Sequence, residues 1–476
     1  MATPDPIPEG VIVIGGGPAG LTAAYELQRR GVRALVLERS DKVGGHSRTD
    51  QFRGFRFDIG GHRFFTKIKP VMEIWTEVLG DRFLLVPRLS RIYYDGRFFQ
   101  YPLKMSNVIF GLGLWNSFMI LMSYLRARIF PYRNETNFEE WVINRFGERL
   151  YRTFFKTYTE KVWGIPCDQI QAEWAAQRIK GLSLERAVIN ALVGDRGKRV
   201  KSLIEEFHYP QLGPGMMWEE MSRLLREKGA EVSLLSAVTA VHRDGYHVVG
   251  VTVQRDGARE RADAGQFIAS MPITELIRSF SPAAPDEVLE AASHLRYRDF
   301  LTVCLIVDHP DLFPDNWIYV HSPEVQMGRL QNFKNWSPHM VPDPSKSSVG
   351  GEYFVNEGEP LWEMRDDELI ELASRELALL GLTGGAAIEG GVVYRQRKAY
   401  PIYDPTYRGH LEVISGFLKK FDNLQMIGRN GLHKYNNQDH SMLTAILAVE
   451  NLFGAAHDIW QVNADQAYHE EAIEED

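Results

Sequence analysis

Short apolar runs and an amphipathic segment alternate at the N-terminal end of the chain. Residues 11–14 (VIVI) and 34–37 (ALVL) are continuous apolar runs, as in strands that are buried on both faces. Between them, residues 21–30 have the apolar spacing of an amphipathic helix. The order strand, helix, strand predicts an α/β fold with a parallel sheet.

The pattern becomes helical from Tyr101 to about Gly213, where strand signals disappear. Thr136 and Glu139 have the spacing of a capping box, and the apolar residues that follow share one helix face. This stretch predicts a helical insertion.

Strand signals return after the insertion. Runs rich in β-branched residues between positions 232 and 269 indicate that the chain comes back to complete the first sheet. Further short strands, separated by Pro, Asp and Asn turns, predict an antiparallel sheet in a second domain. They lie at residues 301–308, 317–321, 328–333 and 352–356. Near the C-terminal end, a strand at residues 424–427 precedes a helix at residues 441–452.

A glycine-rich turn joins the first predicted strand to the first predicted helix. Gly15, Gly17 and Gly20 form G-x-G-x-x-G, and Glu38 ends the next strand, which completes the context of a dinucleotide-binding fingerprint. The glycines permit the tight turn, the approach of a pyrophosphate and close helix–strand packing, and the helix N-terminus offers N–H groups to the anion. We expect Glu38 to accept hydrogen bonds from ribose hydroxyls.

Two further Gly-Gly turns favour FAD over NAD as the dinucleotide. They lie at residues 44–45 and 60–61, and each lets the backbone approach a flat ligand closely. A buried isoalloxazine requires such an approach, whereas a nicotinamide coenzyme that leaves after reaction does not.

Composition and charge exclude several classes of function. The 476 residues are 44% hydrophobic, and the formal net charge is −8, which argues against nucleic acid as a partner. Five acids among the last seven residues predict a solvated acidic tail. Cys167 and Cys304 have no metal-ligand spacing, so we expect neither a zinc site nor a disulfide framework. The opening residues lack the basic and apolar regions of a signal peptide, so we expect a cytoplasmic protein.

Residues 108–125 (VIFGLGLWNSFMILMSYL) form a long apolar stretch. Gly111, Gly113, Asn116 and Ser117 interrupt it, so we expect no integral membrane span. Buried helices are the main interpretation, and a peripheral membrane contact is the alternative.

Several sequence blocks resemble known flavoproteins. E-R-x-x-x-x-G-G-x-x-x-T at residues 38–49, followed by FDIGGH at residues 57–62, is similar to the flavin amine oxidase and protoporphyrinogen oxidase superfamily. More narrowly, six blocks resemble the UDP-galactopyranose mutase family, in that family's order along the chain. They are DIGGH (58–62), QYPLK (100–104), KVWGIP (161–166), GRLQNFKNWSP (328–338), KAYPIYD (398–404) and GRNGLHKYNNQDHS (428–441).

The resemblance implies an isomerase of cell-surface polysaccharide biosynthesis, with reduced FAD as the active cofactor and NAD(P)H as a reductant. N5 of the reduced flavin attacks the anomeric carbon of a nucleotide-diphosphate sugar, the diphosphate leaves, and the sugar recloses with the other ring size. No net redox change occurs. Because negative charge builds on the leaving diphosphate, the reaction calls for planar, bidentate cations there.

The candidate site residues follow from these blocks. The resemblance implies catalytic roles for His62 beside the flavin and for Arg329 and Arg429 at the diphosphate. The substrate-binding residues that it implies are Tyr101, Arg178, Tyr319, Tyr400, Tyr435 and Asn437. The cofactor-binding residues expected from the fingerprint and the resemblance are Gly15, Gly17, Gly20, Glu38, Arg39, Gly45, His46, Ser47, Gly60, Gly61, His62, Gly428, Arg429, Asn437, Gln438 and Ser441. The last helix would direct its N-terminus at the flavin, an effect that Asp439 would oppose unless it faces away.

The sequence departs from the mutase pattern at two places. Tyr101-Pro102-Leu103-Lys104 lacks the aromatic residue that stacks on the nucleotide base in that family, and the turn between Tyr435 and Asn437 is shorter. Two other functions therefore stay open. One is an FAD-dependent oxidoreductase that oxidises an amine or an apolar substrate, and the other is a scaffold without flavin, as in the Rab escort proteins.

The expected architecture is a discontinuous, Rossmann-like FAD-binding domain with an antiparallel sheet substrate domain and a helical insertion. The FAD-binding segments are 1–100, 206–275 and 411–460, the insertion is 101–205, the sheet domain is 276–410 and the acidic tail is 461–476.

Overall fold

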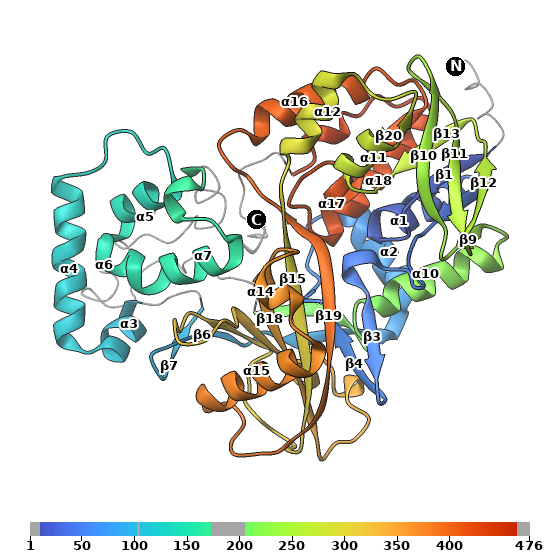
Figure 1. Cartoon of the computed structure of the whole chain (residues 1–476). Helices are drawn as coiled ribbons and strands as arrows, with labels where there is room; N and C mark the ends of the chain where they lie inside the picture. Colours follow the sequence, from blue (N-terminus) through green and yellow to red (C-terminus); the bar gives the residue numbers. More distant parts are fainter. Residues whose placement is uncertain (1–9, 102–104, 173–204, 464–476) are drawn as a thin grey trace.

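The computed structural model describes residues 10–101, 105–172 and 205–463. Figure 1 shows an α/β unit at the upper right, a sheet unit below it and a helical unit at the left edge.

The α/β unit is built on a five-stranded parallel sheet in the order β20-β13-β1-β2-β9. The strands are β1 (Val11–Ile14), β2 (Ala34–Leu37), β9 (Glu231–Ser233), β13 (Gln266–Ala269) and β20 (Leu424–Met426). The helices packed around it are α1 (Pro18–Arg29), α2 (Lys69–Leu79), α10 (Gly215–Glu227), α17 (Gly428–Gly431) and α18 (Gln438–Leu452). The fully buried VIVI run of β1 occupies the centre of this sheet, as the sequence predicts.

A four-stranded sheet in the order β12-β11-β10-β14 shares the hydrophobic core of the α/β unit. Its strands are β10 (Ala237–Asp244), β11 (His247–Arg255), β12 (Ala258–Ala262) and β14 (Phe280–Ser281). The helices α11 (Ile273–Ser279), α12 (Asp286–His294) and α16 (Tyr407–Leu418) contribute to the same core.

The sheet unit has seven strands in the order β19-β15-β18-β17-β16-β6-β7. They are β6 (Ser90–Tyr94), β7 (Arg97–Gln100), β15 (Tyr297–Val307), β16 (Trp317–Val320), β17 (Arg329–Asn332), β18 (Ser347–Val355) and β19 (Ile388–Pro401). The helices of this unit are α13 (Phe333–Trp336), α14 (Pro360–Glu363) and α15 (Asp366–Leu379). Two small ladders, β3 (Thr49–Phe52) with β4 (Phe55–Asp58) and β5 (Phe83–Pro87) with β8 (Glu206–Pro210), complete the described strands.

The helical unit lies within the predicted insertion, of which residues 102–104 and 173–204 are outside the described ranges. It contains α3 (Met105–Leu112), α4 (Leu114–Ile129), α5 (Phe138–Phe146), α6 (Glu148–Leu150), a π-helical turn (Tyr151–Lys156) and α7 (Thr157–Trp163). The cap of α5 lies one residue later than predicted, because the Asn137 side chain accepts from the backbone N–H of Glu140. Thr136 instead donates to the Glu140 carboxylate from its N–H and its hydroxyl.

The structure differs from the expected domain boundaries in three places. Strands β6 and β7 lie in the seven-stranded sheet and not in the first FAD-binding segment, because β6 pairs with β16. Strands β10–β12 belong, with β14, to a separate sheet, so within residues 232–269 only β9 and β13 complete the parallel sheet. The boundary at 276 falls inside α11, whose apolar residues are buried in the core of the α/β unit.

No helix within the described ranges is both long enough and apolar enough to cross a membrane.

Candidate functional site

Two glycine turns lie against each other at the N-terminus of α1. Gly44 N donates to Gly16 O at 2.9 Å, and a Cβ added at Gly45 would lie 3.3 Å from Gly17 Cα. A Cβ added at Gly20 would lie 1.8 Å from Gly15 O, so only glycine fits where the helix meets the strand. The loops present backbone at the start of α1, which is the arrangement that receives a pyrophosphate.

The two glycine turns, at residues 15–20 and 44–45, form a glycine cradle that Glu38 holds in place. Its Oε2 accepts from Gly16 N at 2.6 Å and its Oε1 accepts from Ser40 N at 2.8 Å. The carboxylate lines the cavity beside the cradle, where it can also accept from a ribose.

A cavity of about 1210 Å³ extends from the cradle across to β17 and β19 of the sheet unit. It exceeds the roughly 300–1,000 Å³ of single small-molecule sites, so it has room for a dinucleotide and a second molecule. Among the described residues that line it, ten are Lys or Arg and four are Asp or Glu. The basic residues are Arg39, Arg48, Arg63, Lys67, Arg329, Arg395, Arg397, Arg408, Arg429 and Lys434, and the acidic residues are Glu38, Glu275, Glu412 and Asp439. A chain with a net charge of −8 thus encloses a basic cavity.

The Gly60–Gly61 turn joins the two halves of the cavity. Gly60 has φ +94°, and Gly61 N donates to Glu352 Oε1 at 3.1 Å. His62 Nδ1 donates to Gly60 O at 2.8 Å, so the neutral ring carries its proton on Nδ1. Burial lowers the pKa of His62 to about 4. His62 therefore supports its own loop, and it lines the cavity as an uncharged ring.

His46 is the second neutral histidine of the site. Its Nε2 lies 3.2 Å from Asn430 Nδ2, and since an amide nitrogen only donates, Nε2 accepts. Burial, followed by the nearby charge of Arg429, lowers the pKa of His46 to about 3.

We expect these two histidines to make the protein less stable in mild acid. In the unfolded chain each histidine has a pKa near 6.5 and is protonated below that pH. In the native protein the lowered pKa keeps each ring neutral over the same range, so protonation favours the unfolded chain. Each histidine should then lower the free energy of unfolding by up to about 1.4 kcal/mol per pH unit as the pH falls from 6.5 towards 4. Melting temperatures at pH 7.5, 6.5 and 5.5 measure this loss, and His62→Gln should reduce it. A His62→Gln variant with the full wild-type pH dependence would contradict the assignment.

Arg329 is part of a buried hydrogen-bonded cluster. Its Nε donates to Glu352 Oε2 at 2.6 Å and its Nη2 donates to the Tyr400 hydroxyl at 2.8 Å. Glu352 is fully buried, and Gln331 Nε2 also donates to it, at 2.9 Å. Burial acts to lower the pKa of Arg329, but Glu352 raises it well above its usual range. Because Glu352 neutralises its charge, Arg329 presents to the cavity a hydrogen-bond donor of fixed direction and not a net positive charge.

Arg429 differs from Arg329, because no carboxylate pairs with it among the described residues. Its Nε donates to Ala399 O at 2.9 Å and its Nη1 donates to Asn436 O at 3.1 Å. The guanidinium lies 4.1 Å from the ring centre of Tyr435, which stacks on Tyr400 with centroids 5.7 Å apart. Main-chain carbonyls and an aromatic face thus hold an uncompensated positive charge at the cavity wall.

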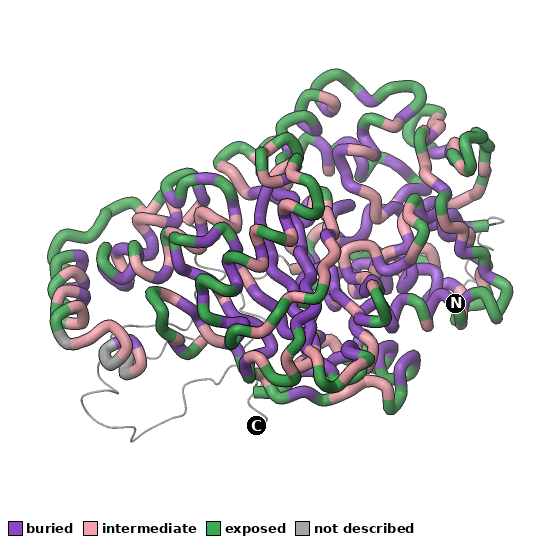
Figure 2. Tube along the Cα trace, turned by 60° about the horizontal axis from the view of Figure 1, so that its bottom comes forward, coloured by how far each residue is buried: buried purple, intermediate pink, exposed green. Residues whose placement is uncertain are grey.

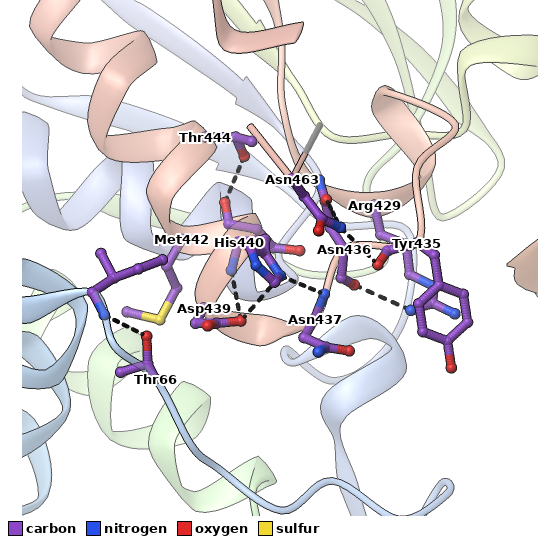
Figure 3. Close-up of polar contacts among 12 residues, drawn as sticks. Thr66, Arg429, Tyr435, Asn436, Asn437, Asp439, His440, Met442, Thr444 and Asn463 are labelled. Carbon is purple, nitrogen blue, oxygen red and sulfur yellow. Dashed lines mark hydrogen bonds and ion pairs between the residues drawn. The ribbon is translucent and has the colours of Figure 1, made fainter. Parts of the chain in front are cut away.

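The N-terminus of α18 also opens into the cavity. Asn437, Gln438 and Ser441 line it, and Figure 3 shows Arg429 and Tyr435 on one side of this N-terminus and Asp439 on the other. Asp439 Oδ1 accepts from the backbone N–H of His440 at 2.8 Å, so its carboxylate is engaged by the first turn of its own helix.

The residues present fit FAD. Within the described part of the chain, several buried polar atoms of the cavity wall lack a hydrogen-bond partner, and the glycine cradle leaves room for a pyrophosphate. They include Ser47 Oγ, Gln331 Oε1, Asn430 Oδ1 and Gln438 Oε1. Buried polar groups are normally satisfied, so these atoms point to a polar ligand.

Most of the candidate residues are brought together in this one cavity. Tyr319, Tyr400 and Tyr435 line its sheet side, and Arg39 lies at the cradle end, paired with Glu275 at 3.2 Å. Tyr101 lies behind Tyr319, with ring centroids 4.7 Å apart, and not on the wall itself. Arg178 lies outside the described residues, as does most of the predicted acidic tail.

Glu352 and Gln331 are not among the site residues that the sequence predicts. The sequence signal for Glu352 is that it is the one acidic residue in SSVGGEYFV, the run of small and apolar residues that forms β18. A strand buried on both faces rarely holds a carboxylate without a partner.

Comparison with known proteins finds flavin-containing relatives. The profile described as "Flavin containing amine oxidoreductase" matches residues 18–401. A curated relative, "Putative flavin-containing monoamine oxidase AofH" of Mycobacterium tuberculosis, is 27% identical over 60% of this chain, and the match spans only 62% of that relative's length. A "Probable UDP-galactopyranose mutase" of Klebsiella pneumoniae is 25% identical over 34% of this chain and 43% of its own length.

The fold is that of a solved structure titled "Crystal structure of reduced UDP-Galactopyranose mutase". The two structures superpose with a TM-score of 0.83, at 23% identity, over 97% of this chain and 99% of the other. On the profile match, which covers most of its length, the chain belongs to the flavin containing amine oxidoreductase family.

Proposed function

We propose that the protein is an FAD-dependent mutase that interconverts the pyranose and furanose forms of a nucleotide-diphosphate sugar. The observation that carries the proposal is the basic cavity in an acidic protein. Arg48, Arg329, Arg395 and Arg397 already pair with carboxylates behind the wall. The positive charge left for FAD and an anionic substrate is that of the other cations, above all Arg429, which pairs with no carboxylate among the described residues.

FAD in its reduced form supplies a nucleophile for the anomeric carbon when it is bound. The glycine cradle and Glu38 would hold its pyrophosphate and ribose, and the first turn of α18 would face the ring system. The positive end of that helix stabilises negative charge on the reduced ring.

Arg429 and Arg329 would bind the diphosphate from two sides. Arg429 brings an uncompensated charge, and Arg329 brings a donor whose direction Glu352 and Tyr400 fix. Preorganised donors of this kind stabilise charge as it develops on the leaving group, because they need not reorient during the reaction. Neutral His62 and His46 add no competing charge beside the flavin.

The second candidate is an oxidoreductase that acts on an amine, and the monoamine oxidase name of the Mycobacterium relative favours it. The charge of the cavity argues against it. An ammonium substrate would meet a wall with ten basic and four acidic residues. The carboxylates behind that wall on the sheet side, Glu352, Glu357 and Asp366, already pair with its arginines.

The mutase proposal predicts isomerisation without net oxidation. Purified enzyme reduced with dithionite should convert UDP-galactofuranose to UDP-galactopyranose, measured by anion-exchange chromatography, and the oxidised enzyme should be inactive. NADPH and NADH in place of dithionite test the nicotinamide reductant. Hydrogen peroxide release from an amine in air, with no isomerisation by the reduced enzyme, would select the oxidoreductase.

A further inference from the structure

The outward face of α4 carries a continuous apolar stripe that no described element covers. Eight of the fifteen large apolar side chains that are exposed on the described residues lie between positions 115 and 132. Trp115 is 72% exposed, Phe118 51% and Ile129 68%. Helix α4 stands at the left edge of the molecule in Figures 1 and 2, on the side away from the α/β unit.

The helix geometry separates this stripe from the core. At about 100° per residue, Trp115, Phe118, Met122, Leu125 and Ile129 fall on one face. The buried residues Ile120, Tyr124 and Ala127 fall on the opposite face, where they pack into the core of the helical unit. The exposed stripe is therefore not the face by which α4 packs on the protein, because the opposite face of α4 is already buried in the core of the helical unit.

Positive charge borders the stripe on both edges. On the same helical projection the exposed Arg126 flanks Trp115 and Met122, and the exposed Arg128 flanks Leu121. No acidic residue occurs between Asp95 and Glu135, whereas Arg97, Lys104, Arg126, Arg128 and Arg133 do. This segment is basic in a chain with a net charge of −8.

We propose that the outward face of α4 docks onto an anionic lipid surface. An apolar face with aromatic residues and basic flanks lies in the plane of the headgroups, with its side chains in the acyl boundary and its arginines at the phosphates. At 16 residues, α4 is too short to span a bilayer but suits this parallel placement. A second copy of the chain fits less well, because it would bring the same basic flanks with no acidic residue in the segment to meet them.

Vesicle flotation of the FAD-loaded full chain tests the proposal. Vesicles of phosphatidylcholine with about one quarter phosphatidylglycerol should carry the protein, pure phosphatidylcholine should carry about tenfold less, and raising the salt to about 0.5 M should weaken the binding. The double variant Phe118→Ser/Leu125→Ser and the variant Arg126→Gln should each lose most of the binding.

The controls separate docking from misfolding. Leu379→Ser removes an apolar side chain of α15 that is more exposed than Phe118 or Leu125, and this variant should float like the wild type. Since Phe118 and Leu125 are exposed, the double variant should keep its melting temperature and flavin spectrum. The proposal is overturned if the wild-type protein does not float on the anionic vesicles. It is also overturned if the wild-type protein is a dimer by light scattering that the double variant converts to a monomer, without vesicle binding.

Discussion

Replacing Arg429 with alanine should lower kcat/KM for UDP-galactofuranose by about a thousandfold while the purified variant keeps its FAD and its fold. Loss of one preorganised donor to a developing anion costs about 10²–10³ in rate, and Arg429 also supplies the uncompensated charge of the cavity wall. Because no described carboxylate pairs with Arg429, the substitution leaves no buried carboxylate without its cation. The measurement combines steady-state kinetics of the reduced enzyme with flavin content and melting temperature.

Arg329→Ala should behave differently, since it loses activity and stability together. It leaves Glu352, which is fully buried, without its cation, and breaking a buried pair in this way costs about 3–5 kcal/mol. The double variant Arg329→Ala/Glu352→Gln should recover much of the stability but not the activity.

Arg91 provides the matched control. Arg91 lies on β6 of the same sheet and forms a bidentate pair with the fully buried Asp315 of the loop before β16, but it does not line the cavity. Arg91→Ala should lose stability as Arg329→Ala does and keep kcat/KM per folded molecule. Wild-type turnover by Arg429→Ala would contradict the proposal that Arg429 binds the diphosphate. A loss of turnover in Arg91→Ala as large as that in Arg329→Ala would show that the loss of activity follows from the loss of stability alone.

The geometry of the glycine cradle was predictable from the sequence because it follows from backbone requirements. Gly15 and Gly20 need glycine for reasons of turn geometry and close packing, and these reasons act over a few neighbouring residues. The apolar runs of β1 and β2 then fix the strands that flank the turn. Local sequence therefore determines this local structure.

The sheet side of the cavity depends on pairings between distant residues, which a local sequence pattern does not contain. Glu352 accepts from Gly61, Gln331 and Arg329, so three separate segments meet at one carboxylate. Strand β6 likewise joins the sheet unit through its pairing with β16, over 200 residues later in the chain. Family resemblance supplied Arg329 and Arg429 as candidates, but only the structure distinguishes the compensated cation from the uncompensated one.

Gly17→Ala should abolish FAD binding and leave the protein folded, whereas Gly20→Ala should prevent folding. A methyl group at Gly17 would meet only Gly45, at an ordinary 3.7 Å, and the backbone there has φ −82°, which alanine adopts without strain. The methyl group would nevertheless fill the cradle that a pyrophosphate must enter, since Gly17 lines the cavity. At Gly20 the methyl group would lie 1.8 Å from Gly15 O, inside the packed contact of α1 with β1.

The two variants therefore separate cofactor binding from folding at positions three residues apart. The ratio of flavin to protein absorbance should fall at least tenfold in Gly17→Ala, with the melting temperature of the flavin-free protein unchanged. Gly416→Ala, in α16 with no atom within 4 Å of the added Cβ, should keep the flavin and gain up to about 1 kcal/mol from helix propensity. Full flavin content in Gly17→Ala would mean that the pyrophosphate does not lie in the glycine cradle. The basic residues assigned to a second anion would then have to accommodate FAD itself, and the case for a diphosphate substrate would lose its main support.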